Sequence, residues 1–381
     1  MLRSLYIRNL RGISSGNVDG LTDVNVFVGK NNSGKSTILD SIYLLNNIFY
    51  PDDCFGNYIL DYILSKKSGE TNRDSLYYKY QRNNDIKIDV EYIQTTVGGA
   101  KGATDETKEL VKNEASVLKL SYGDGVWRVP NLLISNTRSD EEIMNAIGSP
   151  DDKRLPNIDS IDDLLKSQTS HWNNDIQRTA AELRRLKSNI YNTQYFHSGI
   201  FQIFESMETD IWKKLHRTRG DKEVYSAINE IYNENIDHIT YTPGEDGEHL
   251  RLLYDDYASA SSSLGDGLRF TFILLSALES YNPSVALIEE PENHQHPSAY
   301  SGLADAYSSY SQQNQTQLFI ATHSYDFIRE LTESTKEYGL DLSIFHLSLE
   351  EGDLQTRKMN RPDVEVLEDI GIDPRRLKEY G

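Results

Sequence analysis

The pattern of apolar and polar residues at the start of the chain predicts two strands followed by a helix. Residues 2–10, LRSLYIRNL, alternate apolar and polar positions, which is typical of a half-buried strand. Residues 20–29, GLTDVNVFVG, end in a more apolar run that predicts a buried strand. In residues 36–49, STILDSIYLLNNIF, apolar side chains recur at helical spacing.

The middle of the chain has a mixed pattern. Residues 74–93 predict two strands joined at Asn83 and Asn84, and residues 116–129 predict a second hairpin. Between them, residues 96–116 are polar and predict a loop. Helical patterns follow at 139–147, 175–191, 201–215 and 222–235.

Buried strands return near the carboxyl terminus. Residues 284–290, SVALIEE, and 316–324, TQLFIATHS, are apolar runs separated by a predicted helix, which indicates a parallel βαβ unit. We therefore expect a mixed α/β domain to which both ends of the chain contribute, residues 1–95 and 238–381. Residues 96–237 are expected to form an inserted, mostly helical middle region.

Composition narrows the class of protein. The formal net charge of −20 argues against a surface that is basic all over and coats nucleic acid, although a local basic patch is compatible with it. A single cysteine, Cys54, excludes an internal disulfide and favours a reducing, cytoplasmic location. We see no signal peptide, and the apolar run 270–278, FTFILLSAL, is too short to cross a bilayer, so no membrane association is expected.

The segment Gly29–Ser36, GKNNSGKS, matches the phosphate-binding loop pattern G-x-x-x-x-G-K-[ST] and lies between a predicted strand and a predicted helix. Gly29 and Gly34 allow the backbone to curl so that its N–H groups face phosphate oxygens. Lys35 supplies a positive charge to the β and γ phosphates, and Ser36 offers a hydroxyl to magnesium. ATP and Mg²⁺ are the expected ligands. The expected nucleotide-binding residues are Gly29, Asn31, Asn32, Ser33, Gly34, Lys35, Ser36 and Thr37.

Two carboxylates, Glu289 and Glu290, end the strand in VALIEEPENHQHP. In a nucleotide-binding sheet, carboxylates at this position hold magnesium beside the phosphate loop. We expect Glu289 at the magnesium position and Glu290 to orient or deprotonate the attacking water. A zinc site at His294 and His296 is disfavoured, since their spacing is i, i+2 and no cysteine is near.

His323 follows the last buried strand, in ATHS. Ligands of parallel sheets bind at the carboxyl ends of the strands. A neutral His323 could therefore donate a hydrogen bond to the γ-phosphate and sense its presence.

As a set, GKNNSGKS, SSSLGDGLR, LIEEPENHQHP and ATHS resemble the motifs of ATP-binding-cassette ATPases of the chromosome-maintenance and RecF type. The set is most similar to stand-alone AAA15/OLD-like ATPases of bacterial and archaeal defence and repair loci. The resemblance implies an ATPase head with a mixed β-sheet, flanking helices and a helical insertion. It also implies that SSSLGDGL is a variant signature loop, whose Ser263 and Gly265 reach the γ-phosphate held by a second protomer. Asp266 departs from the usual glycine, and the glutamine that links ATP to a partner surface has no clear position, Gln81 being one candidate.

The resemblance leaves the biological role open. Long coiled coils and a nuclease domain, which some relatives carry, are not expected here. One reading is an ATPase that acts as a homodimer or higher homo-oligomer and controls a separate effector, a nuclease, in defence against phage or plasmids. The alternative is a RecF-like, ATP-gated scaffold that binds DNA in repair, with Arg178, Arg184, Arg185 and Lys187 as a basic stripe. A transporter ATPase fits poorly, because of the large middle region.

Overall fold

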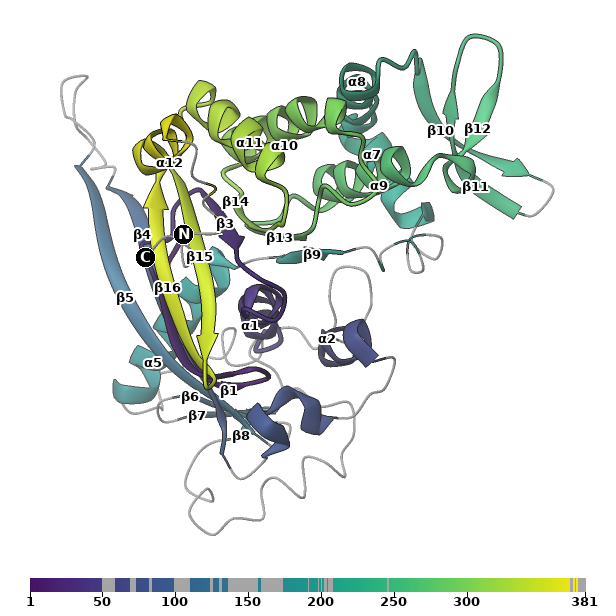
Figure 1. Ribbon diagram of the computed structural model, residues 1–381. Coiled ribbons are helices and arrows are strands. Elements are labelled where there is room, and N and C mark those ends of the chain that lie inside the picture. Colours follow the sequence, from purple (N-terminus) through teal and green to yellow (C-terminus); the bar gives the residue numbers. More distant parts are fainter. Residues whose placement is uncertain are drawn as a thin grey trace.

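The computed structural model has one large mixed sheet, covered by helices on both faces (Figure 1). The described residues are 1–49, 59–68, 73–81, 84–98, 110–123, 126–129, 132–135, 157–158, 174–190, 192–197, 199, 201, 204, 208–244, 247–370, 373 and 375.

Thirteen described strands form the large sheet in the order β8-β7-β6-β5-β4-β1-β2-β16-β15-β3-β14-β13-β9. In chain order they are β1 (Leu2–Leu10), β2 (Ile13–Asp19), β3 (Val24–Val28), β4 (Ile86–Gly98), β5 (Leu110–Gly123), β6 (Val126–Val129), β7 (Leu132–Ser135), β8 (Asn157–Ile158), β9 (Gln194–Phe196), β13 (Val285–Glu289), β14 (Gln317–Ala321), β15 (Leu342–Glu350) and β16 (Asp353–Asn360).

The strands β15, β3, β14, β13 and β9 are neighbours and all run parallel. Their register places Ile288 beside both Ile320 and Phe196, and Ile320 beside Val26. The carboxyl ends of these strands therefore meet at one edge of the sheet. The βαβ unit expected at 284–324 is confirmed, with a helix between β13 and β14.

Helices pack on both faces of this sheet. Their bounds are α1 (Lys35–Asn46), α2 (Ile59–Ser68), α5 (Asn174–Asn189), α7 (Glu208–Thr218), α8 (Gly220–Tyr232), α9 (Asp266–Tyr281), α10 (Tyr300–Asn314), α11 (Tyr325–Glu337) and α12 (Arg361–Asp369). Helices α1, α2 and α5 share one hydrophobic core, and α7 to α11 share the other. Successive side chains of β3 point to opposite faces of the sheet and so reach both cores. Phe27 lies in the first core, and Val24, Val26 and Val28 lie in the second.

The middle of the chain departs from its predicted pattern. Residues 96–116 were expected as a loop, but β4 extends to Gly98 and β5 begins at Leu110 as its antiparallel partner. Within 96–237, expected to be mostly helical, β5 to β9 all join the large sheet. Most residues at the end of β4 and the start of β5 are polar. The sequence pattern there therefore does not indicate strands. The helix expected at 139–147 lies outside the described residues.

The hairpin expected at 74–93 is wrong in its first half. Residues 73–80 form the short 3₁₀ turns η1 (Arg73–Leu76) and η2 (Tyr78–Tyr80), and β4 supplies the second half. Tertiary contacts account for this, since Tyr77 is buried in a bridge to Leu10 and the Tyr78 hydroxyl donates to the Glu351 carbonyl.

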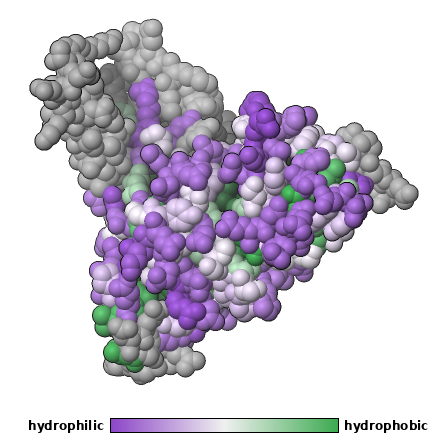
Figure 2. Space-filling model, turned by 90° about the horizontal axis from the view of Figure 1, so that it is seen from above, coloured by the Kyte–Doolittle hydropathy of each residue, from purple (hydrophilic) through white to green (hydrophobic). Residues whose placement is uncertain are grey.

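A second, three-stranded sheet lies beside α7 and α9 at one end of the molecule (Figure 1). It consists of β10 (His238–Gly244), β11 (Gly247–Leu253) and β12 (Ala258–Ala260). The described surface seen from above is mostly hydrophilic, with apolar residues in small separate patches (Figure 2). None of the described helices has the length and apolar character needed to span a membrane.

Candidate functional site

The phosphate loop joins the end of β3 to the start of α1. Gly29 and Gly34 have φ angles of 146° and 100°, which glycine adopts without strain. A side chain at Gly29 would collide with the Leu347 carbonyl and with Ser33. The loop thus has no room for a side chain at Gly29, and the positive φ angle favours glycine at both positions.

Lys35 is the first residue of α1, and its ammonium lies inside the curl of this loop. Its Nζ donates to the carbonyl oxygens of Gly29, at 3.0 Å, and Lys30, at 3.1 Å. Ser33 and Thr37 are buried around it, whereas Asn31 and Asn32 are exposed. The loop therefore presents N–H groups, a helix N-terminus and a cation to one place, which suits phosphate.

Ser36 and Glu289 come together from opposite ends of the sequence. The Ser36 hydroxyl donates to Glu289 Oε1, and the Tyr195 hydroxyl donates to Oε2 at 3.1 Å. Burial raises the pKa of Tyr195 well above its usual value, and the nearby Asp40 and Glu289 charges raise it further, so Tyr195 remains a donor. Hydroxyl and carboxylate oxygens are the ligands that Mg²⁺ prefers, together with phosphate oxygens. The residues at this position thus fit a magnesium–nucleotide complex.

Glu290 follows Glu289 with a left-handed φ of 53°, a costly conformation for a residue with a side chain. Its N–H donates to the Ala321 carbonyl at 2.7 Å, which fixes this turn to the neighbouring strand. Its carboxylate lies 3.7 Å from His323 Nε2 and accepts from Asn293 Nδ2 at 2.6 Å. The side chains of Glu290 and His323 are 38% and 37% exposed, so both are accessible to a ligand.

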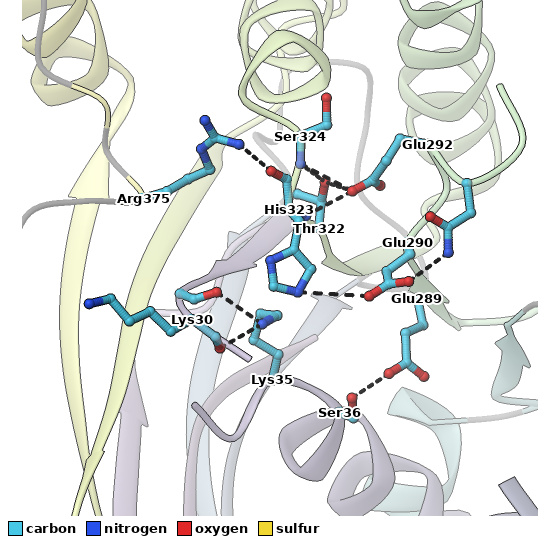
Figure 3. A network of polar contacts seen from close by, with 12 residues as sticks. Lys30, Lys35, Ser36, Glu289, Glu290, Glu292, Thr322, His323, Ser324 and Arg375 are labelled. Atoms are coloured by element: carbon cyan, nitrogen blue, oxygen red, sulfur yellow. Dashed lines mark hydrogen bonds and ion pairs between the residues drawn. The ribbon is translucent and has the colours of Figure 1, made fainter. Parts of the chain in front are cut away.

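Glu292 holds the segment that carries His323. Its Oε1 accepts from the Thr322 hydroxyl at 2.7 Å, the His323 N–H at 2.7 Å and the Ser324 N–H at 3.1 Å. Figure 3 shows the His323 ring pointing toward Lys35 and the Glu290 carboxylate. Partial burial lowers the pKa of His323, and the Lys35 charge lowers it further, so the ring is neutral at pH 7.

The loop that precedes α9 does not face this edge of its own chain. Ser263 is exposed, and its hydroxyl donates to the Ala260 carbonyl at 2.8 Å. Gly265 is exposed at the N-cap of α9, and no heavy atom lies within 4 Å of the position that a Cβ would take. Helix α9 packs in the core opposite to that of α1. Both residues are thus free to meet another molecule.

The loop 290–296 packs directly against the start of α9. Gln295 Nε2 donates to the Gly267 carbonyl at 2.9 Å, and the Tyr232 hydroxyl donates to Gln295 Oε1 at 2.7 Å. His294 lies 3.9 Å from Asp266. His296 Nδ1 accepts from the Ser298 N–H and so caps the next turn. In the described part of the chain, no group of three or more His, Cys, Asp or Glu side chains could hold a metal ion.

Tyr195 and Glu292 are site residues that the sequence analysis did not single out. Tyr195 lies on β9, three residues long and without a pattern of its own, so its position depends on pairing with β13. His197 directly follows Phe196, the residue of β9 that pairs with Ile288. Gln81, the candidate for the linking glutamine, instead lines a cavity with Arg8, outside the parallel strands.

The basic stripe proposed for DNA lies on α5, which packs against β4. Arg184 is exposed and Arg185 is half-buried, forming an ion pair with Glu182 at 3.2 Å. Lys187 is half-buried near the end of the helix. The side chain of Arg178 lies outside the described residues.

Comparisons with known proteins identify the family and the fold. A family model described as AAA ATPase domain matches residues 1–263 and 267–328. A protein of Helicobacter pylori described as an ATP/GTP phosphatase is 21% identical over 350 residues, which cover 88% of this chain and 89% of that protein. Among solved structures, the Smc head domain of Pyrococcus furiosus, with an extended coiled coil and bound to the C-terminal domain of ScpA, superposes with a TM-score of 0.52 at 12% identity. That match covers 97% of this chain and 99% of the other.

Proposed function

Because the chain belongs to the AAA ATPase domain family, we propose that ATP closes two copies of it into a dimer, which controls a separate effector protein. The chain is an ATPase with the fold of chromosome-maintenance heads. Dimer closure, the effector and the biological setting are our proposal.

The exposed loop at the start of α9 is the observation that carries the proposal. Ser263 and Gly265 face solvent, and α9 directs its positive N-terminal end outward with them. In cis, one chain already assembles Lys35, Glu289 and Glu290 around the phosphate position. The outward loop can therefore complete the site of a second copy, with two ATP molecules held between the two chains.

The proposed roles in hydrolysis follow from the positions of the side chains. Lys35 binds the β and γ phosphates, while Ser36 and Glu289 hold Mg²⁺, which neutralises phosphate charge when bound. Glu290 accepts the proton of the attacking water or orients it. Neutral His323 donates to the γ-phosphate from the other side.

A separate effector is the proposed output of this switch. A head of the same fold is bound to a partner protein in the Pyrococcus furiosus structure, which supports partner binding here. We propose a nuclease in defence against phage or plasmids as the effector and a cytoplasmic location. Pull-down from the native host with the Glu290→Gln variant, ATP and Mg²⁺ should recover it in stoichiometric amount.

Light scattering tests the dimer directly. Glu290→Gln keeps the shape of the side chain but removes the base, so ATP should bind, remain intact and double the mass of the particle. Lys35→Ala removes the phosphate cation and should stay at its starting mass with ATP. If the mass of the Glu290→Gln form does not respond to ATP, the closed two-copy dimer is refuted.

A DNA-binding scaffold is the second candidate, supported by the exposed Arg184 on α5. The net charge of −20 and the ion pair of Arg185 with Glu182 weigh against it. A salt-dependent DNA mobility shift that disappears on charge reversal of Arg178, Arg184, Arg185 and Lys187 would favour this function.

A further inference from the structure

The carboxyl-terminal part of the chain reaches back to the phosphate edge through Arg375. Its Nη1 donates to the His323 main-chain carbonyl. Its Nε and Nη2 hold the Asp373 carboxylate, with distances of 2.9 and 2.5 Å. The guanidinium lies over the Tyr325 ring, 5.8 Å from the centroid. Figure 3 shows Arg375 approaching His323 from the side opposite to Glu292.

The peptide unit of His323 is therefore held from two sides. Glu292 accepts its N–H and the N–H of Ser324, and Arg375 donates to its carbonyl. The imidazole itself is 37% exposed and approaches Glu290 at 3.7 Å. Because more than a third of the ring is exposed, its direction depends on the backbone that carries it.

We propose that Arg375 is a positioning residue for His323: it fixes the backbone of His323 so that the ring meets the γ-phosphate. This rests on the role proposed above for His323. A charge-assisted hydrogen bond from a guanidinium that is itself oriented by a carboxylate is strong and directional. A misplacement of about 1 Å at a reacting centre can cost about a hundredfold in rate, so a partial loss of order here should be measurable.

A merely structural role for Arg375 makes a different prediction. If Arg375 only ties down the end of the chain, its loss should lower thermal stability and change hydrolysis no more than other destabilising changes do. If it positions His323, kcat should fall while nucleotide affinity stays the same.

The first experiment compares Arg375→Ala with Arg329→Ala. Arg329 lies on α11 shortly after His323, is more than half exposed and forms an ion pair with Glu330. We expect kcat of Arg375→Ala to fall about tenfold with an unchanged dissociation constant for a fluorescent ATP analogue. Arg329→Ala should keep the kcat of the wild type. Equal kcat values for all three proteins would overturn the proposal.

Conservative variants separate orientation from charge. Arg375→Lys keeps the cation but cannot hold Asp373 and the carbonyl together in one planar fork, so it should not restore kcat. Asp373→Asn keeps size and shape, and should lower kcat in the same direction as Arg375→Ala. These variants also serve if Arg375→Ala fails to fold. Full activity of both would overturn the proposal.

A double-mutant cycle identifies the residue through which Arg375 acts. In the His323→Ala background, Arg375→Ala should have no further effect on kcat, because the group that it positions is gone. Equal fold-losses in both backgrounds would overturn the proposal. If His323→Ala alone retains full activity, the role proposed for His323 fails, which is a distinct result.

The pH profile tests whether the Arg375 charge acts on the His323 ring. The groups that face His323 are Lys35, Glu290, Glu292 and Arg375, and the Arg375 charge contributes to its lowered pKa. Arg375→Ala should therefore shift the acid limb of kcat/KM to higher pH, whereas Arg329→Ala should leave it in place.

Discussion

Two glycines at the start of α9, Gly265 and Gly267, should differ in what an alanine substitution changes. At Gly267 it should lower stability, and at Gly265 it should lower activity. A Cβ at Gly265 would have no heavy atom within 4 Å. A Cβ at Gly267 would lie 2.6 Å from the His294 carbonyl oxygen and 2.9 Å from Gln295 Oε1. Gly267→Ala should therefore destabilise the folded chain, and Gly265→Ala should disturb only what approaches from outside.

The structure sets the size of each effect on the free energy of unfolding. At Gly267, the new methyl would be about 0.7 Å closer to a carbonyl oxygen than ordinary carbon–oxygen contacts. Overpacking of this kind costs about 1–3 kcal/mol, and alanine inside a helix returns about 0.5–1 kcal/mol. The net loss is on the order of 1 kcal/mol. At Gly265, alanine is a weaker N-cap, which lowers the free energy of unfolding, but it also makes the unfolded chain less flexible, which raises it. The two changes cancel to within about 0.5 kcal/mol.

Urea denaturation, compared at equal slope m, measures the change in stability of each variant. Steady-state ATP hydrolysis measures the change in activity. Gly265→Ala should unfold at the midpoint of the wild type and bind ATP normally, yet lose at least about tenfold in kcat. The reason is that its methyl occupies the surface that meets the phosphate of the second copy. Full hydrolysis by Gly265→Ala would refute a tight approach of this loop to phosphate. An unchanged midpoint for Gly267→Ala would refute the packing argument.

Three further predictions concern Tyr195, the buried ion pair of Arg11 with Asp40, and the titration of His323. Tyr195→Phe removes the hydrogen bond to Glu289 and should raise the Mg²⁺ concentration for half-maximal hydrolysis about 10- to 100-fold, as a magnesium titration would show. Arg11→Met removes the ion-pair partner, at 3.0 Å, of the buried Asp40 and should lower the free energy of unfolding by about 3 kcal/mol, seen as an earlier urea midpoint. Because the pKa of His323 in the free protein is lowered from 6.5, its neutral form persists at pH 7, and kcat/KM should decline only as the pH falls below 6.5; a decline centred above 6.5 would contradict this assignment.

The contiguous motifs could be predicted from the sequence because each one is a strand end plus the turn that follows it. The glycine spacing of GKNNSGKS already dictates a curled loop, and the pattern VALIEE already ends a buried strand in carboxylates. Parallel pairing of β3, β13 and β14 then brings Lys35, Glu290 and His323 to the same edge without further information. This is why the parallel core was predicted correctly, whereas the catalytic roles of these residues stay predictions.

Residues that reach the site through pairing or over long sequence distances could not be predicted in this way. Tyr195 contacts Glu289 because of the register between β9 and β13, and a three-residue strand leaves no periodic signal. Arg375 contacts a main-chain carbonyl, which imposes no pattern on the sequence around it. The sequence did not predict the hairpin of β4 and β5 beyond residue 95, because its side chains there are mostly polar. Backbone hydrogen bonds between the two strands form without an alternating apolar pattern.

One loop connects the phosphate edge of the chain to its outward face. Glu292 in this loop binds the segment of His323, and Gln295, three residues later, binds the first turn of α9 at Gly267. Only two residues separate these two anchor points, so a shift of one anchor would be carried through the backbone to the other. A change of the His323 segment on meeting the γ-phosphate would thus be felt at Gly265, where the second copy is proposed to bind. The same contacts that build the hydrolytic site can therefore make closure of the dimer depend on the nucleotide.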